Sequence, residues 1–219
     1  METIADCTGD PRERTLLVLL PPAFGTPRDF IEHGFVAAVR DRGLPVDVVV
    51  AGAIADYYLD QSVVESLHAE VIAPARARGY RRVWLGGISI GGFGSLLYRS
   101  RHDAVEGLLL LAPYLGSRPV VNEVLRAGGL AKWQPDPNAP RDHERELLGW
   151  LKEGLARDDV PQRMLLGYGA DDRFAPSIEL LAKALPEDQV VRGSGGHDWE
   201  TWGGLWREMV ARWRLERTC

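Results

Sequence analysis

The stretch RVWLGGISIGG, residues 82–92, joins an apolar run to a serine that is flanked by glycines. Residues 83–85 are typical of a short buried strand, residues 87–91 match G-x-S-x-G, and a helical pattern follows over 91–101. A sharp strand-to-helix turn holds a serine hydroxyl above the sheet and requires small neighbours two positions away on either side. The stretch therefore predicts a nucleophilic Ser89 at such a turn.

The rest of the chain alternates short apolar runs with amphipathic segments. Besides 82–85, the runs typical of strands lie at 15–20, 46–50, 105–111, 163–168 and 189–192. Besides 91–101, the helical patterns lie at 29–42, 61–78, 118–127, 142–156, 177–184 and 199–215. This alternation predicts an α/β fold with a mainly parallel central sheet and helices on both faces, in one domain over 1–219.

Residues 113–161 interrupt this alternation, because the segment is rich in proline and contains only two helical patterns. It is too short to have a core of its own, so we interpret it as an excursion from the sheet. The excursion is either a small cap over the site or an inert surface insertion.

Composition and charge exclude several classes of protein. The chain has 26 Lys and Arg against 31 Asp and Glu, without a basic cluster, so we expect no nucleic-acid partner. The longest apolar runs, 16–20 and 108–112, are far shorter than the about 20 residues of a transmembrane helix. The polar segment 1–14 has no secretory pattern, so we expect a cytoplasmic protein. Neither a metal-ligand motif nor a dinucleotide or P-loop motif is present, and we expect no metal and no cofactor.

A nucleophilic serine needs a base, and five histidines are available. Four of them lie within, at the end of or at the start of helical patterns, where solvent-facing or half-buried side chains are the simpler interpretation: His33, His68, His102 and His143. His197 instead ends the loop GSGGH (193–197), which follows the last predicted strand. That position suits the base in the chain order serine, acid, histidine.

The base in turn needs a carboxylate that orients its ring. The segment GADDRFAP (169–176) follows the predicted strand 163–168 and contains two aspartates. Either Asp171 or Asp172 could serve, and the other then forms the turn or caps the next helix.

Attack on a carbonyl creates an oxyanion, which needs donors that are already in place. One predicted donor is the backbone N–H of Ile90, which follows the serine. The other is expected in the loop PPAFG (21–25) after the first predicted strand. Proline has no N–H, so Ala23 is the first candidate and Phe24 the second.

These motifs resemble the α/β-hydrolase superfamily, and the chain is similar over nearly its whole length to esterase D-like esterases and small carboxylesterases. GISIGG (87–92) resembles their nucleophile elbow, and residues 195–199 resemble their G-x-H-x-W ending. Residues 169–176 resemble their G-x-x-D-x-x-x-P acid loop, which selects Asp172. The family's usual His-Gly after the first strand is here Pro21-Pro22.

Together these residues predict cleavage of a small-molecule carboxylic ester or thioester through an acyl-enzyme on Ser89. Two alternatives remain open, namely an acyltransferase that uses the same residues and a non-catalytic binding protein. The sequence carries no signal for an oligomeric state. Aromatic residues of the loops after the strands are the candidate lining of a substrate pocket: Phe24, Tyr57, Tyr58, Tyr114, Trp133 and Trp199.

Overall fold

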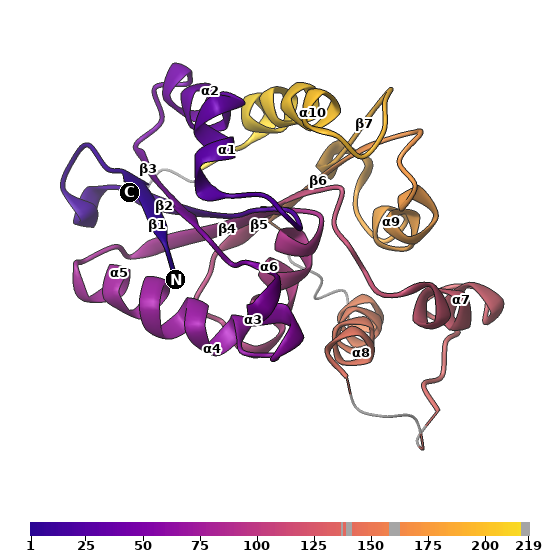
Figure 1. The fold of residues 1–219 in the computed structure, drawn as a ribbon. Coiled ribbons are helices and arrows are strands. Elements are labelled where there is room, and N and C mark those ends of the chain that lie inside the picture. The colour runs from indigo at the N-terminus through magenta and orange to yellow at the C-terminus, as the bar shows by residue number, and fades with distance from the viewer. Residues whose placement is uncertain (137, 139–141, 158–162, 216–219) are drawn as a thin grey trace.

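The computed structural model describes residues 1–136, 138, 142–157 and 163–215 (Figure 1). Within these ranges the strands form one seven-stranded sheet of order β1-β3-β2-β4-β5-β6-β7. β1 pairs antiparallel with β3, and every other pair is parallel. The strands are β1 (Thr3–Asp6), β2 (Thr15–Leu20), β3 (Val46–Ala51), β4 (Arg82–Ile88), β5 (Gly107–Leu111), β6 (Met164–Gly169) and β7 (Val190–Gly193).

Helices cover both faces of this sheet. α1, α2 and α10 lie on one face and α4, α5 and α6 on the other (Figure 1). Every residue of β2, β5 and β6 is buried, as expected of parallel strands that are covered on both sides. The predicted fold is thereby confirmed. The helices are α1 (Pro27–Glu32), α2 (Phe35–Asp41), α3 (Ala55–Leu59), α4 (Val63–Leu67), α5 (Ala73–Ala77), α6 (Ile90–Arg101), α7 (Arg118–Arg126), α8 (His143–Ala156), α9 (Ala175–Ala182) and α10 (Trp199–Arg212).

Two predicted helices are interrupted. Gly34 adopts a left-handed conformation (φ 73°), which separates α1 from α2 within the predicted helix 29–42. The predicted helix 61–78 contains a π-helical turn (His68–Ile72) between α4 and α5. Pro74 has no N–H with which to continue the α-helical ladder, and this local change of hydrogen bonding lies just before it.

Among the described strands and α-helices, β1 and α3 have no counterpart among the sequence predictions. β1 has only four residues and no apolar run, and it forms because it pairs with the exposed edge of β3. α3 lies where a loop after the strand β3 was expected, so Tyr57 and Tyr58 are on a short helix. Within the described ranges, no helix combines the length and the apolarity that crossing a bilayer requires.

The excursion 113–161 provides α7 and α8, which lie together beside the sheet (Figure 1). α8 packs against α6, and Arg101 of α6 forms an ion pair with Glu146 of α8 (2.7 Å). Parts of the excursion, at 137, 139–141 and 158–161, lie outside the described residues. Through α8, the excursion therefore packs against α6, the helix that begins beside Ser89.

A buried carboxylate ties the N-terminal segment to the sheet. The Asp47 side chain is 0% exposed and accepts hydrogen bonds from Arg14 Nε (2.7 Å) and the Tyr80 hydroxyl (2.6 Å). Burial raises the pKa of Asp47, but the bonds from Tyr80, the Thr8 amide and Arg14 outweigh burial and hold that pKa below its usual value. The network thus stabilises the ionised carboxylate inside the fold.

Replacing Asp47 by alanine is expected to lower the free energy of unfolding by about 3 kcal/mol, because Arg14 and Tyr80 lose a buried partner. Urea unfolding followed by circular dichroism measures the change. Asp103→Ala is the control, since Asp103 is 97% exposed where it pairs with Arg99, and it is expected to leave stability almost unchanged. Equal losses in the two variants would contradict the importance of burial.

Candidate active site

Ser89 joins β4 to α6 in a strained conformation. Its backbone has φ 54° and ψ −115°, a region that residues other than glycine rarely adopt. Main-chain bonds hold it there: Ser89 N–H donates to the Leu111 carbonyl (3.0 Å), and its own carbonyl accepts from the N–H groups of Tyr114 (2.9 Å) and Phe93 (3.1 Å). The strain, of order 1–3 kcal/mol, is therefore imposed by the surrounding sheet and loop.

Two glycines make this turn sterically feasible. A Cβ on Gly87 would lie 2.3 Å from the carbonyl of Gly91, and a Cβ on Gly91 would lie 2.2 Å from the carbonyl oxygen of Leu20. Any side chain at either position would therefore push α6 away from β4 and β2. The positions two residues before and after Ser89 must be glycine for the helix to start this close to the sheet.

A chain of hydrogen bonds links three side chains at this turn. Ser89 Oγ lies 3.0 Å from His197 Nε2, and His197 Nδ1 lies 2.7 Å from Asp172 Oδ2. The Asp172 side chain is 0% exposed and that of His197 is 8% exposed. The carboxylate can accept a hydrogen bond from Nδ1–H, which leaves the unprotonated Nε2 to take the serine proton.

The loops after β6 and β7 bring the acid and the imidazole to the serine. Asp172 Oδ1 accepts a bond from the Phe174 amide (2.8 Å), which fixes the carboxylate within its own turn. The rings of Phe174 and Trp202 each lie 4.9 Å from the His197 ring, edge to face. Asp171 is exposed, and its carboxylate has no part in this hydrogen-bonded chain.

Backbone donors lie beside Ser89. Ile90 is the first residue of α6, so its N–H has no acceptor within the helix and the positive end of the helix dipole faces the turn. Ala23 lines the same cavity as Ser89 and Ile90. It belongs to a β-turn in which Gly25 N–H donates to the Pro22 carbonyl (2.9 Å) and Phe24 has φ 65°.

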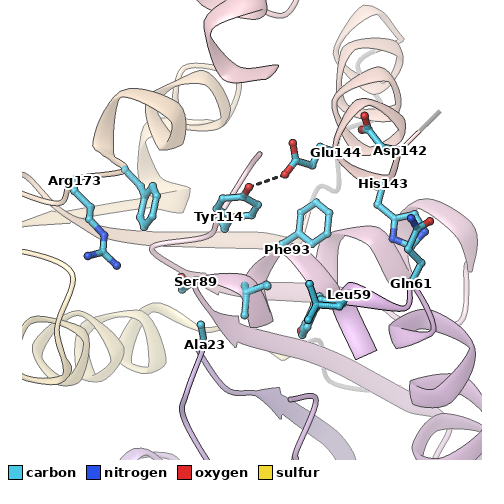
Figure 2. A pocket seen from close by; sticks show the side chains of 13 residues that line it. Ala23, Leu59, Gln61, Ser89, Phe93, Tyr114, Asp142, His143, Glu144 and Arg173 are labelled. Carbon is cyan, nitrogen blue, oxygen red and sulfur yellow. Dashed lines mark hydrogen bonds between the residues drawn. The ribbon is translucent and has the colours of Figure 1, made fainter. Parts of the chain in front are cut away.

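A cavity of about 510 Å³ opens beside Ser89 (Figure 2). Its walls come from the turn 21–25, α3, the start of α6, the loop after β5, the start of α8 and the loop after β6. The lining residues are Ala23, Tyr58, Leu59, Gln61, Ser89, Ile90, Phe93, Tyr114, Asp142, His143, Glu144, Arg173 and Phe174.

Of the six aromatic residues predicted to line a pocket, Tyr58 and Tyr114 line this cavity. The other four do not, and each has a different environment. Phe24 is 100% exposed, and Trp133 is buried in the hydrophobic core at 2% exposure. Tyr57 packs partly buried against the core. Trp199 stacks on His33 of α1 (4.4 Å between ring centres), because it begins α10 on the face of the sheet that α1 and α2 cover.

Several lining residues escaped the sequence analysis. The sequence favours a solvent-facing or half-buried His143 at the start of a helical pattern, yet in the structure it lines the cavity together with its neighbours Asp142 and Glu144. Only the packing of α8 against α6 brings them there. Arg173 and Phe174 directly follow Asp172, and their place in the acid loop is the signal that could have indicated them.

The wall opposite Ser89 is polar and internally paired. Glu144 accepts hydrogen bonds from the Tyr114 hydroxyl (2.6 Å) and from Ser117 Oγ (2.7 Å). Burial, and then the bond to Glu144, raises the pKa of Tyr114, so its hydroxyl stays a proton donor. Burial, followed by the charge of Arg101, lowers the pKa of His143 and favours its neutral form. In the described part of the chain, no three His, Cys, Asp or Glu side chains gather closely enough to hold a metal ion.

Ser89→Gly is expected to raise the free energy of unfolding by about 1 kcal/mol, because glycine adopts a positive φ without strain. Urea unfolding measures the change. Ser95→Gly is the control: this buried serine lies inside α6, where glycine should cost about 1 kcal/mol. A loss of stability in Ser89→Gly as large as in Ser95→Gly would disprove the strain at Ser89.

No family model and no curated protein sequence matches the chain. Solved structures do match it. An S-formylglutathione hydrolase from Staphylococcus aureus is 14% identical with a TM-score of 0.64, over 91% of this chain and 81% of that one. A ferulic acid esterase is 16% identical with a TM-score of 0.64, over 96% of both chains. Est1E from Butyrivibrio proteoclasticus is 18% identical with a TM-score of 0.60, over 95% of this chain and 90% of its own.

At these identities the likeness concerns the fold. It covers the seven-stranded, mainly parallel sheet and its helices. The chain thus has the α/β-hydrolase fold.

Proposed function

We propose that this protein is a serine hydrolase that cleaves carboxylic esters or thioesters through an acyl-enzyme on Ser89. The observation that carries the proposal is the hydrogen-bonded chain from Asp172 through His197 to the strained Ser89, beside a cavity large enough for a small substrate. The esterases and hydrolases among the similar structures agree with it.

In the proposed mechanism Ser89 Oγ attacks the carbonyl carbon while His197 Nε2 takes the hydroxyl proton. The Asp172 carboxylate accepts a hydrogen bond from Nδ1–H and stabilises the imidazolium. The backbone N–H groups of Ile90 and Ala23 bind the negative oxygen of the tetrahedral intermediate. His197 then protonates the leaving alcohol or thiol. Water attacks the acyl carbon while His197 takes its proton, and breaking of the bond to Ser89 Oγ, which regains that proton, releases the acid.

The walls of the cavity favour an acyl group of moderate size. Phe93, Leu59 and Tyr58 supply apolar surface beside Ser89 and Ile90, and the polar wall at Glu144 and His143 limits the length of the space. A small ester with an apolar acyl chain therefore suits the site as a first substrate.

Ser89→Ala, His197→Ala and Asp172→Asn are each expected to lower kcat for p-nitrophenyl butyrate by about 10³-fold or more, because each removes a proton-transfer partner or the nucleophile. Release of p-nitrophenol measures the rate. A fluorophosphonate reagent should label Ser89 in the wild-type protein, as found by peptide mass spectrometry.

Asp171→Asn is the matched control, since Asp171 adjoins Asp172 but is exposed and does not contact His197. Its rate should stay near that of the wild type. The proposed function would be refuted by a wild-type protein that cleaves the ester slowly and is not labelled by the fluorophosphonate. It would also be refuted by a Ser89→Ala variant that keeps most of the wild-type activity.

Ala23→Pro is expected to lower kcat for the same ester by about 10²-fold, because it removes one N–H from the proposed oxyanion hole. Ala23 is the second residue of its β-turn and Phe24, with φ 65°, is the third. A turn of that type accepts proline at the second position, so the fold should tolerate the change.

Ala23→Gly keeps the N–H and is expected to retain most of the activity. The folded state of both variants is checked by thermal unfolding. Equal rates for Ala23→Pro and Ala23→Gly would exclude the Ala23 N–H as the donor and leave that of Phe24.

A further inference from the structure

A second cavity of about 260 Å³ adjoins the first. The two share Tyr114, Phe174 and Arg173, and the rings of Tyr114 and Phe174 meet edge to face at 6.0 Å between ring centres. These two rings therefore form a partition. Because Phe174 also contacts the His197 ring, the second cavity lies one side chain away from the proposed catalytic imidazole.

One face of α7 forms the opposite wall of the second cavity. Its lining residues on α7 are Arg118, Val121, Asn122 and Leu125, which recur at helical spacing along the whole helix. Val121 and Leu125, with Pro176 of α9, make part of the cavity apolar. The hydroxyls of Tyr114 and Ser177 also line it, but they donate to Glu144 and to the Phe174 carbonyl. The remaining polar side chains of the lining are Arg118, Asn122 and Arg173.

The two arginines have no carboxylate partners among the described residues. Neither Arg118 nor Arg173 forms an ion pair there, although most other arginines near the excursion do, such as Arg101 and Arg145 with glutamates of this region. Arg173 stacks on Phe174, with its guanidinium carbon 5.0 Å from the ring centre. This contact fixes the stem of Arg173 at the partition and leaves its donors free.

The first cavity supplies the contrast. Asp142 and His143 line its far end, Glu144 lies between Asp142 and Tyr114, and Figure 2 shows Arg173 at the opposite end from His143. The combined space thus has an acidic end and a basic end, with Ser89 lining it in between. A substrate with one negative group would be repelled from the first end and attracted to the second.

We propose that the second cavity is a subsite for a carboxylate carried by the substrate, held by Arg118 and Arg173 while the ester lies at Ser89. The inference rests on the proposed function and names its substrate class, an ester with a free carboxylate on its alcohol or acyl part. Guanidinium groups match a carboxylate with two parallel N–H donors, and the Asn122 amide adds a third donor group.

Two pairs of substrates test the subsite, and the two members of each pair differ only in charge. 4-(Butyryloxy)benzoate and 4-(butyryloxy)benzamide place the carboxylate or its neutral amide on the leaving group. Methyl hydrogen adipate and methyl adipamate place them on the acyl group. The ratio of kcat/KM for the acid to kcat/KM for the amide is measured in each pair, and the pair that responds identifies which part of the ester occupies the second cavity.

In the responding pair, Arg118→Gln and Arg173→Gln are each expected to lower this ratio by about tenfold, because a charge-assisted hydrogen bond is lost. Raising the salt concentration should lower the ratio in the wild type and have less effect in the variants. A variant that merely folds poorly lowers both rates together and leaves the ratio unchanged, so the ratio reports on recognition.

Arg126→Gln is the matched control, since Arg126 is an exposed arginine at the end of α7 that lines neither cavity. Its ratio and its rates should equal those of the wild type. Ratios that do not change in Arg118→Gln and Arg173→Gln in both pairs, or that fall equally in Arg126→Gln, would overturn the subsite.

A binding measurement separates this inference from the proposed function. Calorimetric titration with 4-butoxybenzoate and 4-butoxybenzamide, which have no ester bond, needs no catalysis. The acid is expected to bind about tenfold more tightly than the amide, and Arg118→Gln should remove the difference. Preferential binding without ester cleavage would refute the hydrolase alone, and cleavage of neutral esters without this preference would refute the subsite alone.

Discussion

The close approach of α6 to the sheet is the constraint on which the rest of the site depends. Gly87 and Gly91 leave no room for a Cβ, so α6 begins in direct contact with the backbones of β4 and β2. The chain can make that turn only through a residue with an unfavourable backbone conformation, and Ser89 occupies this position with φ 54°. The conformation directs the hydroxyl away from the helix and leaves the Ile90 N–H beside it.

The parallel sheet then sets what can reach this serine. The strands β4, β5, β6 and β7 lie side by side in chain order, so the loops that follow them emerge at one edge. Asp172 and His197 come from the loops after β6 and β7, and Tyr114 from the loop after β5. The three loops interlock through aromatic contacts at Phe174, which touches both Tyr114 and His197. Three segments that are distant in the sequence thus place Asp172, His197 and Ser89 in one hydrogen-bonded chain.

The excursion between β5 and β6 controls the charge around the site. α8 contributes the acidic wall with Glu144, which two hydroxyl groups satisfy, and α7 contributes Arg118 on the far side of the aromatic partition. Arg173 lines both cavities and joins the two regions. The same insertion therefore provides opposite charges on either side of the loop at Tyr114, so charge as well as shape distinguishes the two cavities.

By itself, the sequence determined the alternation of strands and helices, the serine turn and the two loops with Asp172 and His197, because hydrophobic period and glycine spacing are local properties. It could not yield β1, whose four residues form a strand only against β3, nor the burial of Trp133. It also could not show that His143 and Arg173 line one cavity, since that depends on how α8 packs against α6. Contacts between distant segments leave no periodic signal, and only the tertiary structure decides them.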